Sequence, residues 1–175
     1  MSDRLWAPWR MAYILSAEET SEVCIFCQYP AHGPERFAEH LILCAGERAF
    51  AIMNKYPYSN GHVLIVPRSH ASDPAELSDE DYRATTDLLR AATVRVRKAL
   101  GAHGFNLGMN LGRVAGAGID KHCHYHVVPR WNGDTNFMPV VGNAKVLSEA
   151  VIDTYRRLLP HFADLPGFVP PTEVT

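Results

Sequence analysis

Three histidines alternate with other residues in the segment His122-Cys123-His124-Tyr125-His126, and this row carries the clearest chemistry in the sequence. Successive side chains of a β-strand point to opposite faces, so the three imidazoles are predicted to share one face, roughly 6.5–7 Å apart per step. Histidine is not a preferred strand residue, which makes packing a poor explanation. Three chemistries remain open: a metal site built from the row, an imidazole nucleophile that attacks phosphorus, and a mixed site in which the first histidine binds a structural metal.

A second group of chemically able residues begins with Cys24 and Cys27. Their C-x-x-C spacing can give two thiolates to one tetrahedral zinc ion. No second C-x-x-C follows, so the other ligands must come from separated positions, and His70 and His122 are the candidates. Such a site would join the N-terminal part of the chain to two strands. A thiol pair without metal, or a redox pair, is the alternative interpretation.

The elements that must position these residues follow from local patterns. Residues 62–66 form a short, apolar, β-branched run that is typical of a buried strand, and Pro67 ends it. Residues 54–61 are rich in proline, asparagine and glycine and are predicted to form a loop. Residues 24–27 are interpreted as a turn. The other predicted strands, the first two of which form a hairpin, cover residues 40–44, 49–54, 105–111 and 122–128.

Residues 78–100 form the clearest predicted helix. Ser78 can cap its first turn, acidic residues follow at the positive end of the dipole, and Gly101 ends it. Its apolar face is predicted from residues spaced three or four apart: Tyr82, Leu89, Ala92, Val96 and Leu100. A second helix is predicted for residues 144–159. A meander of strands with helices packed on one side is an α+β fold.

Length and charge limit the classes of function. The chain has 175 residues, which suits one domain, and its net charge of −2 argues against long nucleic acids as partners. No run approaches the roughly 18 consecutive apolar residues of a transmembrane helix. Residues 1–10 lack the pattern of a secretory signal. We therefore expect a cytoplasmic protein that does not bind membranes.

Several residues fall outside the two chemical groups. Cys44 and Cys123 lack metal-ligand spacing and are predicted to be buried as small apolar residues. The aromatic segment LWAPWR, residues 5–10, is expected to dock on its own domain or on a second subunit. Four histidines are predicted to be ordinary surface or core residues: His32, His40, His103 and His161.

The histidine row resembles the motif of the histidine-triad (HIT) superfamily, His-φ-His-φ-His-φ-φ. The resemblance extends to Asn54, to the run GHVLIVP at residues 61–67, to His70, to Asn110 twelve residues before the row, and to the C-x-x-C pair. LWAPWR near the start, AGAG before the row and VVPRWNGDTNFMPVVG after it resemble bacterial diadenosine tetraphosphate phosphorylase or hydrolase-like proteins. The third histidine is present where uridylyltransferase-like relatives have glutamine, which favours hydrolase or phosphorylase chemistry.

The resemblance implies a HIT-like antiparallel sheet with helices packed on it. The whole chain, residues 1–175, is then expected to be a single HIT domain. It would consist of an aromatic N-terminal segment (1–23), a core that contains the triad (24–130) and a C-terminal extension (131–175).

The resemblance also implies a role for each matching residue. His124 matches the nucleophile that takes up a nucleoside monophosphate, with His126 and Asn110 around the scissile phosphate. Asn54 matches a ribose contact, and His62 matches a histidine beside the triad. Water or inorganic phosphate would resolve the covalent intermediate. The zinc ligands of metal-bearing relatives match Cys24, Cys27, His70 and His122.

The expected substrate is a small nucleotide, and diadenosine tetraphosphate is the preferred candidate. A structural zinc ion, magnesium that accompanies the polyphosphate, and assembly into a homodimer or a tetramer are also expected. Three alternatives stay open: a purine nucleoside phosphoramidase, a nucleotide-binding protein with vestigial catalysis, and a metalloenzyme that uses the triad as ligands.

Two features depart from the family pattern or lie beside it. Relatives often place serine or threonine just before the triad, whereas this chain has Gly118-Ile119-Asp120, and backbone N–H groups of the glycine-rich turn at 112–118 are expected to replace the missing hydroxyl. Residues just after the triad are expected either to border the nucleotide pocket or to form an ordered connector: Trp131, Asp134, Asn136 and Phe137.

Overall fold

The structure is a computed structural model, and it describes residues 23–134 and 148–172. The described helices are α2 (Ile25–Ala31), α3 (Asp79–Leu100) and α5 (Val151–Phe162), and the strands are β1 (Ile42–Ala45), β2 (Ala49–Met53), β3 (Val63–Pro67), β4 (Gly104–Met109) and β5 (Tyr125–Arg130). Short 3-10 turns lie at Pro34–Arg36, Pro74–Glu76 and Arg113–Ala115.

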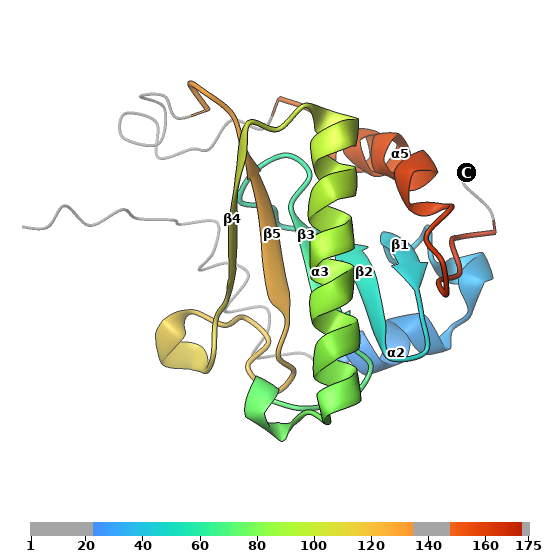
Figure 1. Ribbon diagram of the computed structural model, residues 1–175, viewed down its shortest axis with the longest axis vertical. Coiled ribbons are helices and arrows are strands. Elements are labelled where there is room, and N and C mark those ends of the chain that lie inside the picture. Colours follow the sequence, from blue (N-terminus) through green and yellow to red (C-terminus); the bar gives the residue numbers. More distant parts are fainter. Residues whose placement is uncertain (1–22, 135–147, 173–175) are drawn as a thin grey trace, which may run out of the picture.

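The strands form one antiparallel sheet with the order β1-β2-β3-β5-β4 (Figure 1). The predicted hairpin is present as β1 and β2, and β3 pairs with β2 along its whole length. β5 lies between β3 and β4, opposite Val63–Ile65 on one side and the whole of β4 on the other. The predicted α+β fold with an antiparallel sheet is therefore confirmed.

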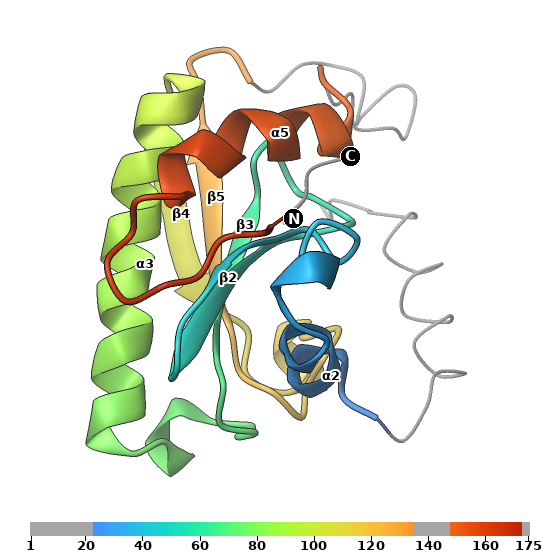
Figure 2. The same cartoon turned by 90° about the vertical axis from the view of Figure 1, so that its right-hand side faces the viewer.

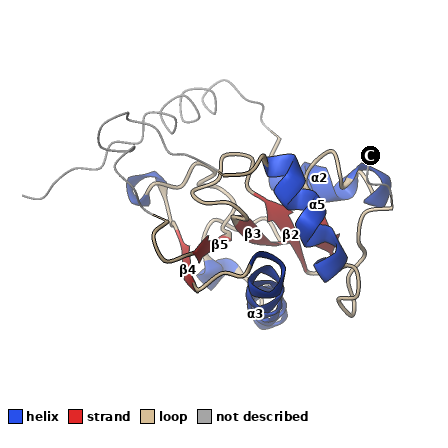
Figure 3. Ribbon diagram, turned by 90° about the horizontal axis from the view of Figure 1, so that it is seen from above, coloured by secondary structure: helices blue, strands red, loops and turns tan. Residues whose placement is uncertain are grey.

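Helices cover both faces of the sheet, which corrects the expectation of helices on one side only. The face that carries Val63, Ile65 and Val127 packs against α3 and α5. The opposite face carries Leu64 and Val66, and it packs against α2. Figures 2 and 3 show α3 and α2 on opposite sides of the strands. The difference arises because residues 24–27, interpreted as a turn, form the start of a helix with a core of its own.

Helix α3 has the predicted boundaries and a rotated apolar face. The Ser78 hydroxyl accepts a hydrogen bond from the Asp81 N–H at 3.1 Å, and Gly101 ends the helix in the left-handed conformation, φ 62°. Its buried residues are Thr85, Leu88, Ala92 and Val96. Tyr82, predicted to be on the apolar face, is 43% exposed, because the buried stripe passes through Thr85 instead.

Several other boundaries differ from prediction. β1 begins at Ile42 instead of residue 40, β3 includes Pro67, and β4 ends at Met109 instead of residue 111. Strand β5 begins at Tyr125 instead of residue 122, and it continues through Pro129 to Arg130. Helix α5 begins at Val151 and passes Pro160 before it ends at Phe162, whereas the prediction was 144–159. The segment at residues 5–10 and the residues at 144–147 lie outside the described residues.

The described residues also bear on smaller predictions. Cys44 and Cys123 are buried, as predicted. The His32 Nδ1 and the His40 Nε2 lie 2.8 Å apart, and the Tyr29 ring stacks on His40, so this group ties the C-terminal end of α2 to the residues before β1. No helix in the described ranges combines the length and the apolar composition that crossing a bilayer requires.

Candidate active site and metal centre

The histidine row lies across the start of β5 instead of along a regular strand. His126 is in β5, opposite Leu64 of β3, whereas His122 and His124 precede the strand. Pairing with β3 and with β4 stops at Tyr125, although β3 continues to Pro67, and the Cys123 N–H instead donates to the Ala71 carbonyl at 2.7 Å. The rings still gather on one side: those of His124 and His126 have centroids 5.0 Å apart.

His124 is held as a neutral imidazole with one defined tautomer. Its Nδ1 lies 2.9 Å from the His122 carbonyl oxygen, and since a carbonyl only accepts, Nδ1 carries the proton and donates. Its Nε2 therefore keeps a lone pair. The side chain is 6% exposed, and burial lowers its pKa below the ordinary value. A neutral imidazole with a free lone pair on Nε2 is the form required of a nucleophile.

His126 receives its tautomer from His62. The backbone N–H of Tyr58 donates to the His62 Nδ1 at 3.1 Å, so the Nε2 of a neutral His62 carries the proton. That Nε2 lies 2.9 Å from the His126 Nδ1 and donates to it. A neutral His126 then carries its own proton on Nε2, where it can serve as a hydrogen-bond donor.

The loop before β3 supports His62 from two sides. The Tyr58 ring stacks on the His62 ring at 4.9 Å between centroids, and the Asn54 Nδ2 lies 3.3 Å from the His62 Nδ1. The Asn54 Oδ1 accepts from the Tyr56 N–H, which fixes the side chain in a local turn. Asn54 and His62, predicted separately, thus lie together. Tyr58 was missed, although the loop sequence NKYPYSNG offered its aromatic residues as a signal.

Asn110 follows the end of β4, near the segment that leads into β5. Met109 is the last residue of β4 and pairs with Tyr125, so Asn110 follows directly next to the residue that precedes β5. Its Nδ2 donates to the Gly116 carbonyl at 3.4 Å. This turn uses its own N–H groups: those of Ala115 and Ala117 donate to Gly112, and that of Gly116 donates to Arg113. These three N–H groups are thus already engaged, which limits the expected replacement of the missing hydroxyl.

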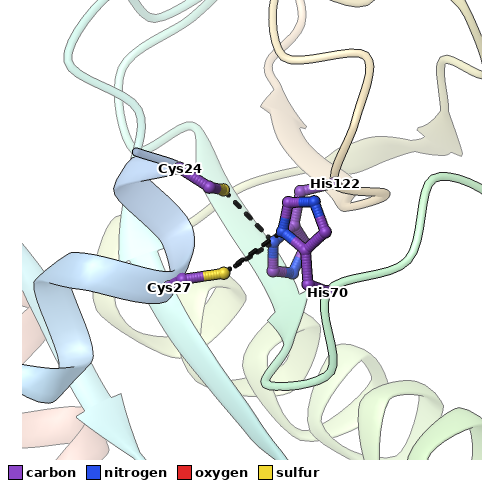
Figure 4. A group of neighbouring side chains, drawn as sticks. All are labelled: Cys24, Cys27, His70 and His122. Carbon is purple, nitrogen blue, oxygen red and sulfur yellow. Dashed lines mark hydrogen bonds between the residues drawn. The ribbon is translucent and has the colours of Figure 1, made fainter. Parts of the chain in front are cut away.

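The four predicted metal ligands come together. The ligand atoms of Cys24, Cys27, His70 and His122 all lie within 4.8 Å of one another (Figure 4). The Cys27 Sγ lies 3.2 Å from the His70 Nδ1 and 3.7 Å from the His122 Nδ1. Two thiolates and two imidazoles are a donor set that suits tetrahedral zinc. His124 and His126 are not members of this group, which argues against a metal site built from the triad.

The electrostatics of the group also fit a cation. The His122 Nε2 donates to the Pro67 carbonyl at 2.9 Å, which directs the Nδ1 lone pair at the two sulfurs. Burial lowers the pKa of His122 to about 4, so this ligand is neutral. Burial, followed by the neighbouring Cys24, raises the pKa of the Cys27 thiol to about 11. A bound cation would supply the positive charge that two adjacent thiolates need.

One aromatic residue of the C-x-x-C motif was also missed. The Phe26 ring is 2% exposed, and its centroid lies 5.5 Å from that of His122 and 5.0 Å from that of His124. Its position between Cys24 and Cys27 was the available signal, but the contact depends on how α2 docks on the sheet. Phe26 therefore belongs to the surroundings of both the metal group and the triad.

The residues after β5 lie away from the triad. Asp134 pairs with Arg130, with O–N distances of 2.6 and 2.8 Å, and the Trp131 Nε1 donates to the Leu100 carbonyl at the end of α3. Trp131 lines a cavity of about 250 Å³ with Asn60 and other residues, none of which belongs to the triad. Asn136 and Phe137 are outside the described ranges.

Comparison with known proteins settles the family. Residues 36–133 match the HIT domain. The chain belongs to the HIT family. The predicted resemblance is thereby confirmed, and the matched residues include the histidine row at the start of β5.

Several relatives of this HIT protein are informative. The AP-4-A phosphorylase of Mycobacterium tuberculosis is 35% identical over 93% of this chain and 86% of the relative. The adenosine 5'-monophosphoramidase hnt1 of Schizosaccharomyces pombe is 36% identical over 48% of this chain and 59% of its own length. A Zn-bound histidine triad family protein from Mycobacterium smegmatis has a TM-score of 0.64 and 25% identity, covering 82% of this chain and 96% of that chain.

Proposed function

We propose that this HIT protein is a nucleotidyl hydrolase or transferase that cleaves dinucleoside polyphosphates, with diadenosine tetraphosphate as the preferred candidate. The observation that carries the proposal is the buried, neutral imidazole of His124, whose Nδ1 proton is used by the His122 carbonyl and whose Nε2 lone pair is left for attack. The identity of 35% to an AP-4-A phosphorylase over most of both chains supports this substrate class.

The reaction proceeds in two displacements at one phosphorus atom. The His124 Nε2 attacks the α-phosphorus, a P–N bond forms, and the P–O bond to the leaving polyphosphate breaks. The His126 Nε2–H donates a hydrogen bond to the leaving oxygen, which departs as a polyphosphate anion. Water or inorganic phosphate then attacks the same phosphorus, the P–N bond breaks, and His124 leaves as a neutral imidazole that keeps its Nδ1–H. The proton that an attacking water molecule loses passes to solvent.

The residues around the triad would hold the substrate. Asn110, at the end of β4, is proposed to contact the scissile phosphate. Asn54, in the loop that carries Tyr58, is proposed to contact the ribose. His62 acts on the substrate indirectly, because its Nε2–H sets the tautomer of His126.

The cysteine and histidine group is proposed to hold a structural zinc ion. The ligands would be Cys24 and Cys27 from the start of α2, His70 from the segment after β3, and His122 from the segment before β5. The ion would supply the cross-link that joins these three segments. The relative from Mycobacterium smegmatis that is described as Zn-bound supports this choice of metal.

Product analysis tests the activity. The purified protein is incubated with diadenosine tetraphosphate, with and without inorganic phosphate, and with magnesium or EDTA in separate arms. ADP and ATP that appear only with phosphate identify a phosphorylase, whereas AMP and ATP identify an asymmetric hydrolase. A loss of rate in EDTA that added magnesium alone restores supports the expectation that magnesium accompanies the polyphosphate, since removal of zinc would not be reversed by magnesium. Intact substrate in every arm would contradict the proposal.

Replacement of the nucleophile tests the covalent step. His124→Ala removes the attacking nitrogen, so turnover is expected to fall by at least about a thousand-fold while the protein stays folded by circular dichroism. Mass spectrometry of quenched wild-type reactions should find a nucleoside monophosphate on His124. Wild-type rates in His124→Ala would show that the nucleophile is another group.

A phosphoramidase is the second candidate. The relative from Schizosaccharomyces pombe that is named an adenosine 5'-monophosphoramidase favours it, over about half of this chain. The same nucleophile would attack the phosphorus of an adenosine phosphoramidate. Comparing kcat/KM for that substrate and for diadenosine tetraphosphate decides between them, and tight nucleotide binding without cleavage of either would instead support vestigial catalysis.

We also propose that two copies assemble through strand β4. Within the described sheet, β4 is an edge strand that pairs only with β5. It is open to solvent near its centre, where Leu107 is 49% exposed. An unprotected edge with an exposed apolar residue favours pairing with another strand. Antiparallel pairing of two β4 strands would give a homodimer with one continuous sheet.

A further inference from the structure

The ring of Phe26 lies directly against the proposed nucleophile. It is in the first turn of α2, it is 2% exposed, and its centroid is 5.0 Å from that of His124 with an angle of 61° between the ring planes. Such a tilted contact places one ring against the edge or face of the other and restricts its rotation. The nucleophile is therefore confined by a side chain that belongs to the C-x-x-C motif.

The metal group determines where Phe26 lies. Its flanking residues Cys24 and Cys27 provide the two sulfurs of the group, so binding of a cation would fix the backbone on both sides of the ring. Phe26 also contacts Phe50 of β2, with centroids 6.3 Å apart. A displacement of the first turn of α2 would therefore move the ring relative to His124.

A second contact leads from the same group to the same imidazole. The His122 carbonyl accepts the Nδ1–H of His124 at 2.9 Å. The His122 ring is itself fixed, because its Nε2 donates to the Pro67 carbonyl and its Nδ1 lies 3.4 Å from the Cys24 Sγ. Both neighbours that orient His124 are thus attached to one cysteine and histidine group.

We propose that Phe26 is a positioning residue for His124, and that the group of Cys24, Cys27, His70 and His122 acts through Phe26 and the His122 carbonyl to orient the nucleophile. The inference rests on the proposed function, since it takes His124 as the nucleophile. A neutral imidazole can present either nitrogen, and only one of them faces the phosphorus. The metal group selects that nitrogen without contacting the substrate, by limiting ring rotation and fixing the acceptor for Nδ1.

Matched replacements of two phenylalanines test the role of Phe26. Phe26→Leu keeps an apolar side chain in the core but removes the ring contact, and kcat is expected to fall about ten-fold with KM within about two-fold of wild type. Phe26→Ala should lower kcat further. Phe37→Leu is the control, because Phe37 is 3% exposed in the same core and is not part of the triad or the metal group. Equal kcat in Phe26→Leu and wild type would overturn the proposal.

A spectroscopic arm separates this inference from the proposed activity. Nitrogen-15 NMR of the imidazoles reports which ring nitrogen of His124 carries the proton, with no substrate present. The zinc-loaded wild type and Phe37→Leu should show a single Nδ1–H tautomer, whereas Phe26→Leu and zinc-stripped wild type should show a mixture. An unchanged tautomer in both would refute the positioning role even if the enzyme is active, and a mixture would support it even if diadenosine tetraphosphate is not the substrate.

Discussion

At the scale of single residues, the chain of hydrogen bonds from the Tyr58 backbone to His126 determines where a proton is available. Backbone N–H groups cannot exchange donor and acceptor roles, so the N–H of Tyr58 fixes the Nδ1 of His62 as an acceptor. The proton of a neutral His62 is then on Nε2, which donates to the His126 Nδ1, and the proton of His126 is on its own Nε2. The consequence is that a residue outside the triad controls the form of a triad histidine.

Replacement of His62 tests this chain. His62→Leu removes the donor to the His126 Nδ1, and kcat is expected to fall by about a hundred-fold because the proton of His126 is no longer held on Nε2. His62→Gln keeps an N–H at the position of Nε2, so the kcat of this variant should stay within about ten-fold of the wild-type value. Steady-state kinetics on both variants check this. Equal losses in both would mean that His62 acts through bulk alone.

The metal ligands make the second residue-scale prediction. Cys24→Ser should abolish stoichiometric zinc binding and lower the melting temperature, since a metal at about a thousand times its dissociation constant adds about 4 kcal/mol to the free energy of unfolding. The His32–His40 contact still holds the other end of α2, so a folded protein is expected. Metal analysis and calorimetry provide the measurement.

Cys44 offers the matched control for that experiment. It is a fully buried thiol in β1, outside the metal group. Cys44→Ala should therefore bind zinc as the wild type does. Full zinc occupancy in Cys24→Ser would show that the four residues do not act as one site.

At the scale of elements, the sequence predicted the features that depend on local residue patterns, such as helix ends and ligand spacing. The four metal ligands were found because C-x-x-C spacing and strand ends are local signals, and the structure brings them within reach of one another. The position of α3 followed from Ser78 and Gly101. The ring contacts of Phe26 and Tyr58 could not be predicted, because they arise when α2 and the loop before β3 dock on the sheet. The late start of β5 likewise depends on a tertiary contact, because the chain before Tyr125 bonds to Ala71 instead of continuing along β3.

Gly61 makes a prediction about the loop that leads into β3. It has a positive φ of 72°, and a Cβ added there would collide with the Leu100 side chain at the end of α3. Gly61→Ala is therefore expected to lower the free energy of unfolding by about 2–3 kcal/mol, through backbone strain and this collision. Gly101 also has a positive φ, but a Cβ added there meets no atom within 4 Å. Gly101→Ala should therefore lower the free energy of unfolding by only about 1 kcal/mol. Urea unfolding measures both, and equal losses would exclude the collision.

At the scale of the whole molecule, the two faces of the sheet serve different purposes. The face under α3 and α5 holds the larger apolar core. The other face holds the core under α2, and the triad and the metal group lie beside that core. The larger core is almost wholly apolar, and its buried tyrosine, Tyr155, donates its hydroxyl to the Ile42 carbonyl at 2.9 Å. The two edges also differ: a bridge between Ala45 and Val169 covers β1, whereas β4 is the open edge of the described sheet.

The open edge leads to the prediction about assembly. If β4 pairs with a second β4, a charge at its exposed centre should oppose assembly, because two copies of that charge would meet near the symmetry axis. Leu107→Lys is expected to weaken the dimer by at least ten-fold, about 1.4 kcal/mol, relative to wild type. Val94→Lys adds the same charge at a site that is 57% exposed on α3 and should leave the dimer intact. Sedimentation at micromolar concentration distinguishes the three proteins. A monomeric wild type would refute the dimer, and equal weakening by both lysines would place the interface elsewhere.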